Sequence, residues 1–233
     1  MKWFRKAAEQ DYAEAQRNLA GCYWSGQGVP EDYTEAVKWF RKAAEQNLPE
    51  AQNMVGYSYW SGQGVPKDYT EAVKWYRRAA EQYCASAQHN LGVCYANGQG
   101  LERNYAEAAK WFRKAAWQDH AQAQHDLGAC FFQGQGVEKD YVEGVKWFRK
   151  AAEQHRAEDQ FILGGCYLDG VGVDKDKVEA CAWWTLAAAT VRPAANDLRD
   201  LKNTMSPEQI ADAEKRVQEL RAQIAARPKQ GDK

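Results

Sequence analysis

The chain is short of proline, of any excess charge and of long apolar runs. Only six of its 233 residues are proline, while Ala, Glu, Lys, Gln and Arg are abundant, a composition that favours helix. The 31 basic and 32 acidic residues leave a formal charge of −1. No net field therefore draws the chain to phosphate backbones or anionic lipid, and nucleic acid is not expected as a partner.

The lack of long apolar runs bears on membrane insertion and location. No stretch approaches the roughly 20 apolar residues that a transmembrane helix needs, and residues 1–6 lack the apolar core of a signal peptide. As written, the sequence predicts a soluble, cytoplasmic chain. It begins halfway through a repeat, so we expect a segment upstream; the location becomes periplasmic or secreted if that segment carried an export signal.

A period of 36 residues dominates what is present. It is marked by equally spaced tryptophans: Trp3, Trp39, Trp75, Trp111, Trp147 and Trp183. Such a period is typical of stacked helical repeats, in which each unit buries its apolar face only against its neighbours. We predict an all-α, right-handed solenoid of helix–turn–helix repeats. Its parts are the second helix of a truncated repeat (1–10), five repeats (11–190), a C-terminal helical cap (191–227) and a disordered tail (228–233).

Each repeat carries signals for two helices, as residues 47–82 illustrate. Apolar residues at three-and-four spacing predict a first helix over residues 49–60. Gly62 follows where a helix C-cap needs a left-handed residue. Asp68 and Glu71, three apart ahead of the next apolar stripe, predict an N-cap and a capping box for the second helix.

These residues follow the pattern A-x-x-x-LG-x-x-Y-x-x-G-x-G-V-x-x-D-Y-x-x-A-x-x-W-[FY]-x-x-AA, which resembles the Sel-1-like repeat, a bacterial-type relative of the tetratricopeptide repeat with a longer interhelical loop. One repeat matches it at Ala87, Leu91, Gly92, Tyr95, Gly98, Gly100, Leu101, Tyr105, Ala108, Trp111, Phe112, Ala115 and Ala116. The resemblance implies a non-enzymatic scaffold or adaptor that binds a partner peptide or protein on the concave face of the solenoid. It also implies bacterial signalling, envelope assembly or host interaction as contexts.

The segment after the last repeat has its own helix signals. Pro193 interrupts the array, and helices are predicted over residues 194–203 and 206–226, the second with Ser206 as N-cap and Gln209 as capping-box partner. This segment resembles the helical tail that often follows the last Sel-1-like repeat, and we interpret it as a lid on the apolar end of the array. A dimerisation helix is the alternative, so the expected state is a monomer or a weak homodimer.

The six cysteines do not form the pattern of a disulfide framework. Cys22, Cys94, Cys130 and Cys166 share one repeat position. Equivalent positions in adjacent hairpins lie roughly 9 to 10 Å apart, beyond the usual reach of a disulfide. Buried free thiols are therefore expected, and Cys166 with Cys181 is the one pairing that stays open.

No residue set predicts a metal, a cofactor or a catalytic centre. His89 and His125 share one repeat position, but no carboxylate or thiolate completes a tetrahedral set at zinc-ligand spacing. The Gly-x-Gly loops recur in every repeat, which turn geometry explains without a phosphate. We therefore expect no enzymatic activity. A hydrolase acting on a cell-envelope substrate and an RNA-binding helical repeat remain the alternatives.

The candidate partner-binding residues lie on the first helix of each repeat, whose inner face becomes the concave wall of a stacked array. By correspondence with the ligand-facing positions of tetratricopeptide repeats they are Arg17, Trp24, Asn53, Tyr57, Trp60, His89, Asn97, His125, Phe132, Phe161 and Leu168. Trp24, Trp60 and Phe132 share one position at which other repeats have Ala or Leu. Either these aromatic residues pack against the next hairpin, or they form a partly exposed groove suited to an extended apolar peptide or helix.

Overall fold

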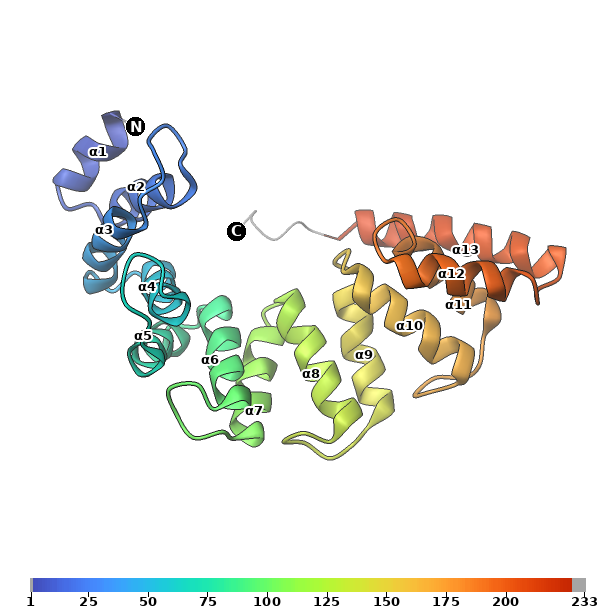
Figure 1. The fold of residues 1–233 in the computed structure, drawn as a ribbon. Helices are drawn as coiled ribbons and strands as arrows, with labels where there is room; N and C mark the ends of the chain where they lie inside the picture. The colour runs from blue at the N-terminus through green and yellow to red at the C-terminus, as the bar shows by residue number, and fades with distance from the viewer. Residues whose placement is uncertain (1, 228–233) are drawn as a thin grey trace. The chain divides into compact units, whose positions relative to one another are not determined.

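A computed structural model describes residues 2–227 of the chain. All regular structure in these residues is helical, so the predicted all-α class is confirmed (Figure 1). The predicted tail, residues 228–233, lies outside the described residues. The helices are α1 (Lys2–Glu9), α2 (Ala13–Ser25), α3 (Tyr33–Glu45), α4 (Pro49–Ser61), α5 (Tyr69–Glu81), α6 (Ala85–Asn97), α7 (Tyr105–Ala116), α8 (Ala121–Gln133), α9 (Tyr141–Ala152), α10 (Ala157–Asp169), α11 (Lys177–Ala187), α12 (Arg192–Lys202) and α13 (Pro207–Ala225).

The chain forms two compact units, unit 1 (residues 1–120) and unit 2 (121–233). We call the first helix of each hairpin the A helix and the second the B helix. Unit 1 holds α1, a B helix, and the hairpins α2–α3, α4–α5 and α6–α7; unit 2 holds α8–α9 and α10–α11, followed by α12 and α13 (Figure 1). Within a unit, each A helix packs on its own B helix and on the B helix of the preceding hairpin.

The A helices end at glycines that the backbone requires. Gly62, the C-cap of α4, has φ of 82°, and Gly64 has φ of 75°, so both lie in the left-handed region, as predicted for Gly62. A Cβ added at Gly64 would lie 2.2 Å from the backbone oxygen of Tyr33. The loop between α4 and α5 thus lies directly against the start of α3, the B helix of the preceding hairpin, and leaves no room for a side chain at Gly64.

The B helices begin at side-chain caps. The Asp68 carboxylate accepts a hydrogen bond from the Glu71 backbone N–H (3.0 Å), which confirms the predicted cap, and the same bond recurs in α3, α7, α9 and α11. The Glu71 carboxylate, predicted to close a capping box, accepts instead from Lys74 Nζ (2.8 Å). Both halves of a capping box are present at Ser206 and Gln209, at the start of α13.

A second glycine, present in four of the five repeats and replaced by Ala20 in the first, allows the A and B helices to approach closely. Gly56 in α4 faces the ring of Tyr76 in α5, and an added Cβ would lie 2.7 Å from a ring carbon. The same contact recurs as Gly92 with Phe112, Gly128 with Phe148 and Gly164 with Trp184. The glycine of the Leu-Gly pair therefore makes room for an aromatic ring of the B helix against the backbone of the A helix.

A ladder of buried glutamines links successive hairpins, a feature that the sequence analysis missed. Gln52 is 3% exposed, and its Nε2 donates to the Ala44 backbone oxygen (3.2 Å) at the end of α3. Its Oε1 accepts from Gln82 Nε2 (2.7 Å) at the end of α5. Glutamines at the same repeat position are Gln16, Gln88, Gln124 and Gln160. Gln16, Gln88 and Gln160 donate in the same way to the backbone oxygens of Ala8, Ala80 and Ala152 at the C-terminal ends of the preceding B helices.

Helices α12 and α13 pack on α11 at the end of unit 2. Val217 and Leu220 of α13 join a buried cluster that contains Trp183 of α11. Ion pairs flank this contact, between Arg216 and Glu179 and between Arg227 and Glu153. The apolar side of α11, which no further hairpin covers within the described residues, is thereby buried.

All six cysteines are free thiols. Cys94, Cys130 and Cys166 are buried, as predicted, whereas Cys22 is half-buried. The pairing of Cys166 with Cys181 that the sequence left open is not formed. Burial in apolar surroundings raises the pKa of Cys94 to about 12 and that of Cys130 and Cys166 to about 11.

Candidate functional site

Four aromatic residues of unit 1 form a continuous patch that we call the aromatic surface: Trp24, Tyr33, Tyr57 and Trp60. Trp24 lies on α2, Tyr33 begins α3, and the other two lie on α4. Ring centroids are 4.8 Å apart for Trp24 and Tyr33, 5.9 Å for Trp24 and Tyr57, and 5.9 Å for the stacked pair Tyr57 and Trp60. The structure thus brings together three of the predicted binding residues.

The residues of the aromatic surface contact buried side chains but remain partly exposed themselves. Trp24 packs edge-on to the buried ring of Phe40 (6.1 Å), and the Trp60 indole N–H donates to Gln99 Oε1 (2.9 Å) in the loop after α6. Tyr57 is 37% exposed, and Trp24 and Trp60 are half-buried. These rings therefore have fixed orientations while retaining surface that faces solvent.

Gly21 leaves bare backbone beside this surface. It occupies in α2 the repeat position that Tyr57 occupies in α4, and Trp24 lies three residues later on the same helix face. A Cβ added at Gly21 would meet no atom within 4 Å. Unlike Gly56, Gly21 is not required by any contact within unit 1, so it leaves room for another chain to approach.

The surface carries little charge. The Tyr33 hydroxyl is hydrogen-bonded to Glu31, which raises the pKa of Tyr33 above its usual value and keeps the hydroxyl protonated. None of the four aromatic residues offers a cation. The aromatic surface is therefore suited to apolar side chains rather than to a carboxylate.

Other predicted residues of unit 1 are held by different contacts. Arg17 pairs with Glu14 of its own helix (3.1 Å), and Asn53 accepts a hydrogen bond from Asn90 Nδ2 (3.0 Å). Asn97 is exposed at the end of α6. These three polar residues lie on A helices but do not form part of the aromatic surface.

His89 takes part in an aromatic stack of its own. Its ring lies 4.9 Å from that of His120, nearly parallel to it, and 5.7 Å from that of Phe112. The described residues contain no group of three or more His, Cys, Asp or Glu side chains placed to hold a metal ion. His89 thus packs against the rings of His120 and Phe112.

The aromatic and aliphatic residues predicted in unit 2 pack against rings and buried side chains of the same unit. Phe132 lies edge-on to Phe148 (5.0 Å), and Phe161 lies 6.2 Å from Trp184. Leu168 packs on the buried cluster of α11 and α13. All three predicted residues are half-buried, as Trp24 and Trp60 are, and Phe132 also lies edge-on to Tyr141 (5.1 Å), which is 40% exposed. Unit 1 differs in having Tyr57 between Trp24 and Trp60, whereas the equivalent residues of unit 2 are Ala129 and Gly165.

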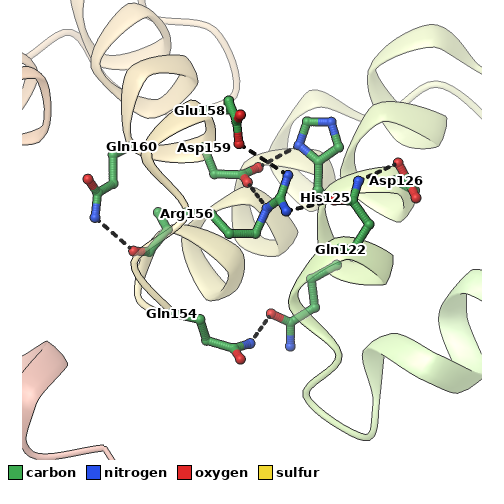
Figure 2. Close-up of polar contacts among 10 residues, drawn as sticks. Gln122, His125, Asp126, Gln154, Arg156, Glu158, Asp159 and Gln160 are labelled. Carbon is green, nitrogen blue, oxygen red and sulfur yellow. Dashed lines mark hydrogen bonds and ion pairs between the residues drawn. The ribbon is translucent and has the colours of Figure 1, made fainter. Parts of the chain in front are cut away.

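The remaining predicted residue, His125, belongs to a polar network that sequence reasoning missed. Its Nδ1 lies 2.8 Å from Oδ1 of the buried Asp159, whose Oδ2 accepts from Arg156 Nε (2.7 Å) (Figure 2). The signal in the sequence was Asp159 itself, because the other repeats have alanine at that position.

Repeats of this kind define a helical-repeat solenoid of the tetratricopeptide-like class, and comparison identifies the family. The family model "Sel1 repeat" matches residues 1–12, 13–48, 49–84, 85–120, 121–155 and 157–189. The chain belongs to the Sel1 repeat family, as its residue pattern predicted.

Two solved structures with more than 30% identity support this assignment. A protective antigen of uropathogenic Escherichia coli with an SLR fold is 35% identical, with a TM-score of 0.84, over 97% of this chain and 48% of the antigen. A Sel1 repeat protein from Oxalobacter formigenes is 37% identical, with a TM-score of 0.71, over 78% of this chain and 75% of that protein. The chain thus spans about half the length of the antigen.

More distant similarity shows the fold alone. An immunity protein of Pseudomonas aeruginosa is 20% identical, with a TM-score of 0.55, over 80% of this chain and 71% of that protein. Comparison with curated proteins gave no match. Sel1 repeat proteins are commonly scaffolds for protein interactions and are generally not enzymes. No helix among residues 2–227 is both long and apolar enough to cross a membrane.

Proposed function

We propose that this chain is a non-enzymatic scaffold or adaptor that binds a partner peptide or protein through the aromatic surface of unit 1. The observation that carries the proposal is the row formed by Trp24, Tyr57 and Trp60 on neighbouring A helices, partly exposed and beside the open backbone of Gly21. Large exposed apolar side chains gathered in one place mark interaction sites on soluble proteins.

Aromatic anchors are energetically suited to this role. Tyr and Trp are enriched among the interface residues whose truncation costs about 2 kcal/mol or more. The rings of the aromatic surface are already oriented by Phe40 and Gln99, so binding orders few additional rotamers. A small apolar contact therefore retains more of its gross energy.

The chemistry favours a partner segment with apolar side chains. Carboxylate recognition needs amide or cationic donors, whereas the aromatic surface presents rings, a neutral Tyr33 hydroxyl and the Glu31 carboxylate. An extended peptide or an amphipathic helix that inserts an apolar side chain beside Tyr57 fits these groups. The positions His125, Phe132, Phe161 and Leu168 in unit 2 stay predictions.

The test is selection of binding peptides from a random display library against the folded full chain. Selected peptides should be rich in apolar anchors, and Tyr57→Ala should weaken their binding at least tenfold. Tyr83→Ala is the matched control, because Tyr83 is 78% exposed in the turn between α5 and α6, away from the aromatic surface. Equal affinity for the wild type and the Tyr57→Ala variant, with melting temperatures unchanged, would contradict the proposal.

A further inference from the structure

Asp159 is a fully buried acidic residue at a position where the other hairpins have alanine. Its relative exposure is 0%. The equivalent residues are Ala15, Ala51, Ala87 and Ala123. Burying a carboxylate is costly unless partners neutralise it and fill its hydrogen-bonding capacity. A substitution of alanine by aspartate in the interior therefore requires compensating groups.

Two basic side chains from different hairpins supply that compensation. His125 on α8 approaches Oδ1 of Asp159 through its Nδ1 (2.8 Å), and Arg156, the N-cap residue of α10, donates to Oδ2 through Nε (2.7 Å). Arg156 Nη1 also donates to Gln122 Oε1 on α8 (2.7 Å). Asp159 lies in the first turn of α10, where the helix dipole favours negative charge. Figure 2 shows these contacts tying α8 to the start of α10.

The surroundings of the His125 ring within unit 2 are acidic on one side and apolar on the other. Besides Asp159, the nearby charges are Asp126 on its own helix and Arg156 at the start of α10, where Glu158 pairs with Arg156 (3.4 Å). Helix α9 presents the ring of Phe148, 5.6 Å away. The His125 side chain is 24% exposed, so a proton can reach it from solvent.

We propose that His125 and Asp159 form a proton-strengthened clamp between the two hairpins of unit 2, α8–α9 and α10–α11. A neutral imidazole donates its Nδ1–H to the carboxylate, so only the acceptor is charged. Protonation gives the donor a positive charge as well and converts the contact into a hydrogen-bonded ion pair, which is the stronger interaction. Mild acid thus tightens the contact between the A helices α8 and α10, and mildly alkaline conditions loosen it.

The direction of the pH dependence follows from linkage. The hydrogen bond to Asp159 raises the pKa of His125 above its ordinary value of 6.5, outweighing desolvation, which lowers it. A group whose pKa is higher in the folded state stabilises that state fully below the unfolded-state pKa. This stabilisation is lost as the pH rises from about 6.5 through the folded-state pKa.

The first test is a proton NMR titration of the histidine rings in the full chain, with the His125 signal assigned by its loss in His125→Asn. Asparagine is tolerated at this repeat position, because Asn53 occupies it in α4. The His125 signal should titrate above pH 6.5, and Asp159→Ala should lower that midpoint. Titration of wild-type His125 at or below 6.5, or a midpoint unmoved by Asp159→Ala, would overturn the proposal.

The second test measures the energetic link. Urea unfolding midpoints at pH 5.5 and pH 8.5 should fall more between the two pH values in the wild type than in His125→Asn. His155→Asn is the matched control, since His155 is exposed and has φ of 63°, which asparagine accepts. It should retain the pH dependence of the wild type. Equal pH dependence in the wild type and His125→Asn would refute the clamp, whatever the partner-binding role of unit 1.

Discussion

Two adjacent glycines in α10, Gly164 and Gly165, should respond oppositely to substitution by alanine. A Cβ added at Gly164 would lie 2.1 Å from Cδ1 of Trp184, whose indole N–H donates to the Phe161 backbone oxygen (2.9 Å) and so fixes the ring. A Cβ added at Gly165 would meet nothing within 4 Å. The two residues share a helix interior, so the gain in helix propensity is common to both.

The expected changes in the free energy of unfolding follow from three contributions. Replacing glycine by alanine in a helix interior stabilises by about 1 kcal/mol. Overpacking a well-filled site costs about 1–3 kcal/mol, and losing the Trp184 hydrogen bond costs about 1 kcal/mol more. Gly165→Ala should therefore stabilise by about 1 kcal/mol, and Gly164→Ala should destabilise by about 1–3 kcal/mol.

Urea unfolding followed by far-ultraviolet circular dichroism measures both variants, with the double variant as a check on additivity. A chain of this size should show the Gly165→Ala gain as a rise of about 2–4 °C in melting temperature. A stabilising Gly164→Ala, or a Gly165→Ala that destabilises by as much as Gly164→Ala, would refute the assignment of the two glycine faces.

Three further predictions rest on single contacts. Tyr83 has φ of 64°, in the left-handed region that asparagine adopts more readily than tyrosine. Tyr83→Asn, which copies Asn47 at the same repeat position, should therefore stabilise the chain by about 0.5–1 kcal/mol in urea unfolding. A lower free energy of unfolding would contradict the left-handed backbone at this residue. Gln52→Leu removes the hydrogen bond to the Ala44 backbone oxygen (3.2 Å) and should lower the free energy of unfolding by about 1–3 kcal/mol in the same assay. An unchanged free energy of unfolding would show that the glutamine ladder does not stabilise the fold. Because burial raises the pKa of Cys94 to about 12, its thiol should react with an aromatic disulfide reagent at pH 8 only on unfolding; rapid native labelling of Cys94, located by peptide mapping, would show that it is not buried.

Most of the fold can be predicted from the sequence because the same helix-capping residues and apolar stripes recur in successive repeats. The left-handed caps such as Gly62, the N-caps such as Asp68 and the apolar stripes of both helices are short-range signals, and the structure shows them where the spacing places them. The glutamine ladder was not predicted because glutamine is usually exposed. Burial of Gln52 depends on its hydrogen bond to the Ala44 backbone oxygen, which the sequence alone does not reveal.

The candidate site depended on contacts between hairpins, which a repeat pattern does not report. Trp24, Trp60 and Phe132 share one position, yet Trp60 bonds to Gln99 while Phe132 packs on Phe148. Phe132 packs within its own hairpin, as Trp24 does on Phe40, whereas the bond of Trp60 reaches the loop of the next hairpin. The same limit applies to Asp159, whose departure from alanine was visible in the sequence although its partners, His125 and Arg156, were not.

The measurement that tests the central claim most directly is the affinity of a selected peptide for Gly21→Arg and for Thr34→Arg. Both variants add one positive charge to the hairpin α2–α3, but Gly21 has open space beside the aromatic surface and Thr34 is exposed on the B helix α3. If the partner lies across the aromatic surface, Gly21→Arg should fold normally and lose binding at least tenfold, while Thr34→Arg should bind as the wild type does. Equal binding by a folded Gly21→Arg variant and the wild type would show that the partner does not lie across this surface.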